Sequence, residues 1–150
     1  MIHIAIVEDE AFYVQQIQNY MERYQQESQR EISVTVYSDG EDILDNYKGD
    51  YDIILMDIQM RFMDGMTAAK NIRKLDDAVV IMFITNMTQY AVQGYEVDAL
   101  DYIIKPVEYF AFSQKLEKAV GRIRRRKRFY VTIPVEEGIQ KLDVSSIYYI

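Results

Sequence analysis

Residues 51–60 read YDIILMDIQM, an apolar run from Ile53 to Met56 that leads straight into a carboxylate at Asp57. An unbroken apolar run of this length is typical of a strand buried on both faces of a sheet. A carboxylate beside such a core costs free energy unless another group pairs with it. The stretch therefore predicts a buried strand that ends at a charged site.

The same pattern repeats on both sides of this stretch. Including 51–56, five strands are expected, and the other four lie at residues 2–7, 32–37, 79–84 and 100–104. Each is followed by a stretch with helical spacing or helix signals, at residues 14–24, 39–47, 65–75, 88–95 and from 107 onward. This alternation predicts an α/β fold, in which helices cover both faces of a parallel sheet.

The composition excludes several classes of site. The chain has 150 residues, of which 49% are hydrophobic and 27% charged, as in an ordinary globular protein. It contains no Cys, so a disulfide, a thiolate metal site and a Cys nucleophile are ruled out, and its one His, His3, argues against a His-based triad. The first ten residues lack the basic region of a signal peptide, and no apolar run approaches the roughly 20 residues of a membrane helix. We expect a cytoplasmic protein that does not contact a membrane.

The charge is unevenly distributed. Residues 122–128 read RIRRRKR and carry six positive charges, so the rest of a chain of net charge −7 sums to −13. Three interpretations of this basic segment stay open: a solvated helix end, an interdomain linker that also contacts DNA phosphates, or an independent nucleic-acid arm.

The last 22 residues, FYVTIPVEEGIQKLDVSSIYYI, lack helical periodicity and are rich in β-branched and aromatic side chains. They supply two or three strands at most, which are not stable alone. We expect a first domain at 1–122, a basic linker at 123–128 and the opening of an incomplete β-rich domain at 129–150. The alternative is a hairpin that extends the first domain.

Polar groups follow four of the five predicted strands. Glu8 and Asp9 come after the first, Asp57 ends the third, Thr85 follows the fourth and Lys105 the fifth. The carboxyl ends of parallel strands lie at one edge of the sheet, where ligands bind in folds of this type. Three carboxylates, a hydroxyl and an ammonium group are therefore expected to converge.

This set of groups is suited to phosphoryl chemistry. Converging carboxylates repel one another unless a cation intervenes, and hard oxygen ligands favour Mg²⁺. A carboxylate can act as a nucleophile and form an aspartyl-phosphate. Lys105 and Thr85 would then contact the phosphoryl oxygens.

Each residue alone has an ordinary interpretation. Glu8 and Asp9 suit a solvated helix N-terminus, and Thr85 suits a helix cap. Asp57 suits a plain strand end, and Lys105 with Pro106 suits a turn. Only the conjunction of the four strand ends is specific.

Five short motifs are spread over residues 1–122: IAIVEDE at 4–10, DIILMDIQM at 52–60, MDG at 63–65, FITN at 83–86 and ALDYIIKP at 99–106. Together they resemble the receiver domain of two-component response regulators. The resemblance implies a flavodoxin-like, doubly wound sheet of five parallel strands in the order 2-1-3-4-5, with five flanking helices. It also implies that a sensor histidine kinase is the phosphodonor.

The resemblance assigns a role to each matching residue. Asp57 becomes the phosphoacceptor, and Glu8, Asp9 and Asp57 hold Mg²⁺ together with the backbone carbonyl of Gln59. Lys105 contacts the phosphoryl group.

Three further roles belong to the switch. Thr85 is the switch hydroxyl and Tyr102 the switch aromatic, although Tyr102 also suits a plain core position. The peptide bond from Lys105 to Pro106 is expected to be cis.

The chain departs from the family pattern in the loop after Asp57. Arg61 and Phe62 stand where the family usually has Pro and Gly, so this loop is expected to bend differently. Asn86 is larger than the residue often found beside the switch Thr. Loop conformation and phosphoryl lifetime therefore do not follow from the resemblance.

The C-terminal part resembles the LytTR class of transcription regulators, because a basic stretch and VTIPVEEGIQKLDVSSIYYI follow ALDYIIKPV. This implies a DNA-binding output through an incomplete domain. It also implies a homodimer through the helix at 88–95, the strand at 100–104 and the last helix.

Two rival functions stay open. A Mg²⁺-dependent phosphatase or phosphotransferase of the haloacid dehalogenase type would also use an Asp nucleophile, but it needs a second acid where this chain has Gln59. A receiver-like interaction module that works without phosphorylation is the other rival. A nucleotide-binding phosphate loop has no support, since neither of its glycine motifs occurs.

Overall fold

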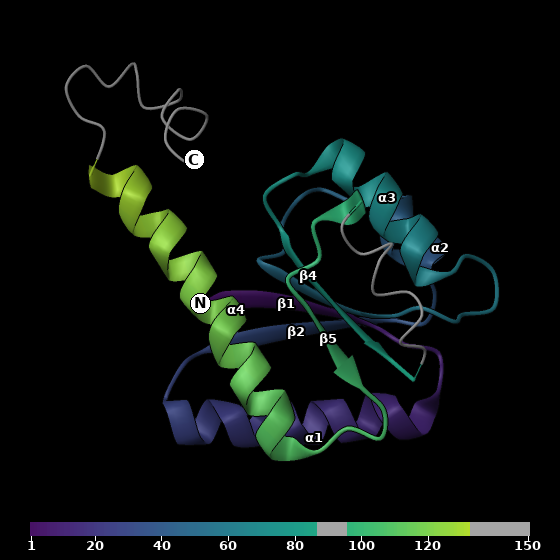
Figure 1. Ribbon diagram of the computed structural model, residues 1–150, viewed down its shortest axis with the longest axis horizontal. Coiled ribbons are helices and arrows are strands. Elements are labelled where there is room, and N and C mark those ends of the chain that lie inside the picture. Colours follow the sequence, from purple (N-terminus) through teal and green to yellow (C-terminus); the bar gives the residue numbers. More distant parts are fainter. Residues whose placement is uncertain (87–95, 133–150) are drawn as a thin grey trace. The chain divides into compact units, whose positions relative to one another are not determined.

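A computed structural model describes residues 1–86 and 96–132, with side chains up to 124. Five parallel strands form one sheet in the order β2-β1-β3-β4-β5 (Figure 1). Their bounds are β1 Ile2–Val7, β2 Ile32–Tyr37, β3 Ile53–Asp57, β4 Val80–Thr85 and β5 Asp101–Ile104. The predicted strand order is confirmed, and each strand lies within one or two residues of its expected position.

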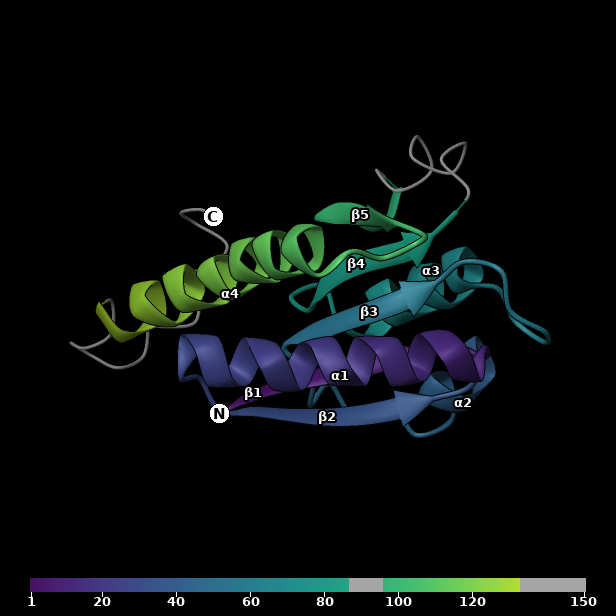
Figure 2. The ribbon, with the colours of Figure 1, turned by 90° about the horizontal axis from the view of Figure 1, so that it is seen from below.

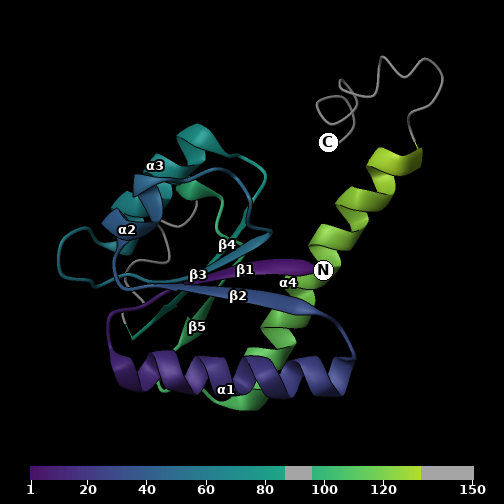
Figure 3. The same cartoon turned by 180° about the vertical axis from the view of Figure 1, so that it is seen from behind.

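The sheet is covered on both faces, as its apolar strands require. The helices are α1 Ala11–Ser28, α2 Gly40–Asp45, α3 Gly65–Leu75 and α4 Tyr109–Thr132. Figures 2 and 3 show α1 on one face of the sheet and α2 with α3 on the other. The start of α4 packs beside α1, where the rings of Tyr20 and Phe112 lie 5.6 Å apart.

Alternation along the strands divides the core into two layers. Ala5, Val7, Ile54, Met56 and Phe83 belong to the cluster shared with Ile43 of α2 and Ala69 and Ile72 of α3. The intervening residues are equally buried, including Ile4, Ile6, Ile53, Leu55 and Met82. Because successive side chains point to opposite faces, this second set lies on the side of α1. Burial on both faces holds the carboxyl ends of the strands in one row.

Two predictions near the C-terminus need comment. The helix expected at 88–95 lies outside the described residues, which contain four helices rather than five. The prediction that a β-rich segment begins at residue 129 is wrong, because α4 continues through Thr132. No Pro interrupts the sequence between Tyr109 and Thr132. Extending an existing helix costs less than nucleating a new one, so residues 129–132 join α4.

The chain divides into two compact units, Met1–Leu116 and Glu117–Ile150. The candidate site lies wholly within the first unit. Within the described part of the chain, no helix combines the length and the apolar character needed to cross a membrane.

Candidate functional site

Glu8 is held by the sheet itself. Its backbone N–H donates to Tyr37 O at 3.0 Å, which extends the pairing of β1 with β2 by one residue. The side chain is 1% exposed, and Oε2 accepts a hydrogen bond from the Glu10 N–H at 3.1 Å. Asp9, the next residue, is exposed. The interpretation of this pair as a solvated helix terminus is therefore wrong for Glu8.

Asp57 is the last residue of β3 and pairs with Ile84 of β4. Its side chain is buried, and Oδ1 accepts a hydrogen bond from the Ile58 N–H at 2.8 Å. The chain turns tightly behind it, because a Cβ on Gly65 would lie 2.0 Å from the Asp57 carbonyl oxygen. Only glycine tolerates this approach, which brings the start of α3 against the end of β3.

Lys105 directly follows β5. Its N–H donates to Thr85 O at 3.0 Å, so the ends of β4 and β5 stay paired to that point. The peptide bond to Pro106 is cis, as the resemblance implied. Thr85 is the last residue of β4 rather than the first residue after it, and its side chain is completely buried.

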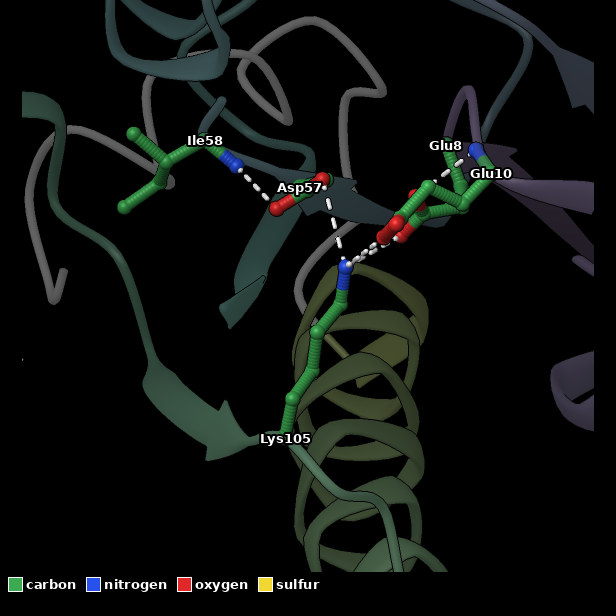
Figure 4. A network of polar contacts seen from close by, with 5 residues as sticks. All are labelled: Glu8, Glu10, Asp57, Ile58 and Lys105. Carbon is green, nitrogen blue, oxygen red and sulfur yellow. Dashed lines mark hydrogen bonds and ion pairs between the residues drawn. The ribbon is translucent and has the colours of Figure 1, made fainter. Parts of the chain in front are cut away.

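The ammonium group of Lys105 lies among three carboxylates (Figure 4). Nζ is 3.1 Å from Glu8 Oε1, 3.3 Å from Asp57 Oδ2 and 3.4 Å from Glu10 Oε1. It also lies 4.1 Å from the centroid of the Tyr13 ring, within range of a cation–π interaction. The predicted convergence of β1, β3 and β5 is therefore present.

Glu8, Asp9 and Asp57 form a group able to hold a metal ion. Each offers a carboxylate oxygen, and these atoms all lie within 4.8 Å of one another. Among the described residues this is the one group of three or more such ligands. Oxygen-only ligand sets favour hard ions such as Mg²⁺.

Negative charge at the site is incompletely compensated. Burial, followed by the charge of Asp57, raises the pKa of Glu8 from 4.5 to about 7. Burial also raises the pKa of Asp57, although Lys105 opposes the shift. Burial alone would lower the pKa of Lys105, but the charges of Asp57 and Glu8 outweigh it and raise that pKa. Perturbed carboxylates around one cation are characteristic of functional sites.

Tyr102 lies on β5, opposite Phe83 of β4. The two rings are 5.5 Å apart, and Tyr102 is half-buried against the core cluster beside α3. This position accommodates both interpretations of Tyr102, as a core aromatic and as a side chain that moves.

The loop after Asp57 exposes the residues that depart from the family pattern. Phe62 is 71% exposed, and the guanidinium of Arg61 lies 5.4 Å from the centroid of its ring. Gln59, whose carbonyl the resemblance assigned to Mg²⁺, begins this loop two residues after Asp57. The role of that carbonyl stays a prediction.

Three residues at or near the site are not predicted from the sequence to have a role there. Glu10 and Tyr13 contact Lys105, yet Glu10 was quoted only as part of the motif IAIVEDE. The sequence predicts Asp39 only as the start of a helix. Its carboxylate also binds the loop that follows Asp57. No local sequence pattern predicts such contacts, since they depend on which side chains meet in the folded protein.

Comparison with known proteins adds a family match. The family model described as the response regulator receiver domain matches residues 4–117. The response regulatory domain of protein mrkE from Klebsiella pneumoniae superposes with a TM-score of 0.72 at 27% identity, covering 83% of this chain and 99% of that one. The family match runs from β1 to the start of α4 and so includes all five strands.

Two curated relatives are longer than this chain. The sensory transduction protein LytT of Bacillus anthracis is 28% identical, over all of this chain and 65% of that protein. The transcriptional regulatory protein LytR of Staphylococcus aureus (strain N315) is 40% identical over 78 residues, which are 51% of this chain and 30% of that protein. The chain thus spans less than two thirds of either relative.

Proposed function

The chain belongs to the response regulator receiver family, and from this premise we propose that it is a phosphorylation-dependent switch of a two-component system. In this proposal a sensor histidine kinase transfers a phosphoryl group to Asp57. Glu8, Asp9, Asp57 and the backbone carbonyl of Gln59 hold Mg²⁺. One observation carries the proposal: Lys105 Nζ lies 3.3 Å from Asp57 Oδ2, beside a group of carboxylates fit to hold a metal ion.

The residues at the site fit Mg²⁺. Their donors are carboxylate oxygens, and burial followed by the charge of Asp57 raises the pKa of Glu8 to about 7 despite the opposing charge of Lys105. When bound, Mg²⁺ would offset the negative charge of these carboxylates and polarise an oxygen of the incoming phosphoryl group.

The protein's own groups position the nucleophile. The Ile58 N–H holds Oδ1 of Asp57, and Lys105 faces Oδ2. In the transfer step a carboxylate oxygen of Asp57 forms a bond to phosphorus, and the bond from phosphorus to the donor's leaving group breaks. The leaving group keeps the electron pair and takes a proton from solvent. Lys105 then pairs with the phosphoryl oxygens, since positioning and charge neutralisation account for most of the rate of phosphoryl transfer.

The switch itself rests on Thr85 and Tyr102. Phosphorylation adds close to two negative charges, and in this proposal it draws the Thr85 hydroxyl toward Asp57 while Tyr102 fills the space left behind. A Thr85→Ala variant is expected to accept the phosphoryl group but to dimerise weakly in response. Dimerisation equal to that of the parent in sedimentation experiments would contradict this relay.

The curated relatives support a transcriptional output for the switch. The LytR match is named a transcriptional regulatory protein. We therefore include in the proposal a homodimer through residues 88–95, β5 and α4, and a DNA-binding region of which residues 133–150, after α4, are the start. A cytoplasmic location belongs to the same proposal.

The decisive experiment is phosphorylation with a small donor. The full chain is incubated with acetyl phosphate, with and without Mg²⁺, and its intact mass is measured. One added phosphoryl group is expected with Mg²⁺, none after chelation and none in Asp57→Ala.

The outcome also separates the rivals. A chain that gains no phosphoryl group, or an Asp57→Ala variant that still gains one, would contradict the proposal. Continuous release of phosphate from the donor would favour the phosphatase alternative, which the uncharged Gln59 disfavours because that enzyme class needs an acid there to turn over its intermediate.

A further inference from the structure

Asp39 is a buried carboxylate outside the metal-binding group. It caps α2 from the turn that follows β2, and only 4% of its surface is exposed. A buried acid normally needs a cation or several hydrogen-bond donors. The described residues give Asp39 no salt bridge, so its partners must be donors of another kind.

Those partners are backbone N–H groups from two segments. Oδ1 accepts from Glu41 N at 3.0 Å, which caps α2, and from Met63 N at 2.9 Å. Oδ2 accepts from Phe62 N at 2.9 Å. Burial by itself would raise the pKa of Asp39, but the hydrogen bonds from Phe62, Glu41 and Met63 outweigh it and lower that pKa. One carboxylate thus joins the β2–α2 turn to the loop that follows the phosphoacceptor.

The same loop is closed at its base. The Gly65 N–H donates to Ile58 O at 2.7 Å, so residues 59–64 leave and return at adjacent points. Packing below the loop is equally tight, because a Cβ on Gly40 would lie 2.9 Å from the Met63 carbonyl oxygen. Asp39 therefore holds the far part of a loop whose first residue is Gln59.

The sequence of this loop explains why it needs an external anchor. Proline fixes its own φ angle and thereby limits the conformations of a loop. Arg61 and Phe62 stand where the family usually has Pro and Gly, and they impose no such limit. The restraint must then come from contacts, and Asp39 supplies two hydrogen bonds to this part of the loop.

We propose that Asp39 is a positioning residue for the phosphoryl site: by binding the N–H groups of Phe62 and Met63 it holds the backbone that carries the Gln59 carbonyl beside Asp57. For the role of that carbonyl toward Mg²⁺, the inference rests on the proposed function. Removal of Asp39 should therefore weaken the affinity of the site for Mg²⁺ more than it lowers the rate of phosphoryl transfer at saturating Mg²⁺.

Asp39→Ser is the sharpest variant. A Ser hydroxyl still caps α2 through Glu41 N but is too short to bridge to Phe62 and Met63. Asp76→Asn is the matched control. The Asp76 carboxylate, between the end of α3 and the start of β4, also accepts three hydrogen bonds, from Ala78 N, Val79 N and the Tyr47 hydroxyl.

The first measurement does not depend on phosphorylation. Amide hydrogen exchange of Phe62 and Met63 is followed by NMR in the metal-free full chain. Both amides should exchange faster in Asp39→Ser than in the parent, and at the parental rate in Asp76→Asn. Parental protection in Asp39→Ser would overturn the inference.

The second measurement titrates Mg²⁺ alone by calorimetry and then titrates it in the acetyl phosphate reaction. In Asp39→Ser the half-saturating Mg²⁺ concentration should rise roughly tenfold, as is usual when an outer contact that orients a metal ligand is lost. The rate at saturating Mg²⁺ should stay near the parental rate.

An unchanged Mg²⁺ midpoint, or a lower saturating rate with no shift in midpoint, would also overturn the inference. If Asp39→Ser does not fold, Asp39→Asn replaces it, with the same expected directions. If the parent binds Mg²⁺ but accepts no phosphoryl group, the proposed function fails, whereas the exchange and binding measurements still decide the role of Asp39.

Discussion

Two buried environments for carboxylates differ in their effect on pKa: one holds Asp39, which binds the loop at residues 59–64, and the other holds Glu8 and Asp57. Asp39 accepts three backbone hydrogen bonds, and its pKa is lowered. Glu8 and Asp57 share one ammonium group, and the pKa of each is raised. Both environments are buried, so burial alone does not decide the sign of the shift.

The difference lies in the number and direction of fixed donors. Backbone N–H groups around Asp39 are held by the fold and favour its charged form. Glu8 and Asp57 instead face one ammonium group, and burial together with the charges of neighbouring acids favours their neutral forms. The first environment stabilises a charged acid, whereas the second disfavours its own charge and is suited to binding a further cation.

The largest expected effect comes from removing the shared cation. Lys105→Ala leaves buried carboxylates without a partner, and losing one member of a buried ion pair typically costs about 3 kcal/mol or more. Urea denaturation of the metal-free protein should show this loss at pH 7 and a smaller one at pH 5, where the acids take up protons.

Lys115→Ala serves as the control for that variant. Lys115 pairs with Asp101, but its side chain is 32% exposed. Exposed pairs contribute about 1 kcal/mol or less. If both variants lose the same free energy of unfolding, the ion pairs of Lys105 contribute no more than exposed surface pairs do.

The next effect is a pH dependence. A carboxyl whose pKa is 4.5 when unfolded and about 7 when folded binds more protons in the native state between these values. The free energy of unfolding should therefore fall as pH rises from 4.5 to 7, by up to about 3 kcal/mol for Glu8. Glu8→Gln should flatten this slope. If the free energy of unfolding of the metal-free protein stays constant or rises between pH 4.5 and 7, the pKa of Glu8 is not raised by folding.

A matched pair of isosteric variants tests the contrast directly. Asp39→Asn should lower the free energy of unfolding by about 1 to 2 kcal/mol, because one acceptor becomes a donor facing a backbone N–H. Asp57→Asn should raise it in the metal-free protein, because the raised pKa shows that the site favours a neutral group. Shifts of the same sign in both variants, measured by urea denaturation at pH 7, would remove the distinction between the two environments.

The smallest expected effect concerns Glu10. Its side chain is 59% exposed and lies 3.4 Å from Lys105 Nζ. Exposed ion pairs are worth at most about 1 kcal/mol, so Glu10→Gln should speed phosphorylation by acetyl phosphate less than about fivefold. The increase is expected because Lys105 becomes freer to meet the phosphoryl oxygens.

Salt provides the check on that prediction. The gain in Glu10→Gln should shrink at high ionic strength, where exposed charges are screened. Glu22→Gln removes the same charge further along α1, and its rate should match that of the parent. A slower Glu10→Gln would mean that Glu10 positions Lys105 rather than competing for it.

Much of the site could be predicted from the sequence, because its residues lie at the ends of parallel strands. Once the apolar runs are read as parallel strands, Glu8, Asp57 and Lys105 must lie at one edge of the sheet, and the structure brings them together. The contacts of Asp39 could not be derived in this way. Its hydrogen bonds join residues 23 and 24 positions apart, between two loops whose proximity no strand pattern expresses.

Periodicity and strand ends are local properties, so the strands, their two-sided burial and the chemical character of the site could be predicted from the residues. The strand order came instead from the resemblance to receiver domains. The sharing of charge became visible in the folded protein, where Lys105 faces Glu8, Asp57 and Glu10 at once and Asp39 is satisfied by backbone donors. Electrostatic balance depends on distances of a few ångströms between side chains from separate elements, and folding alone sets those distances.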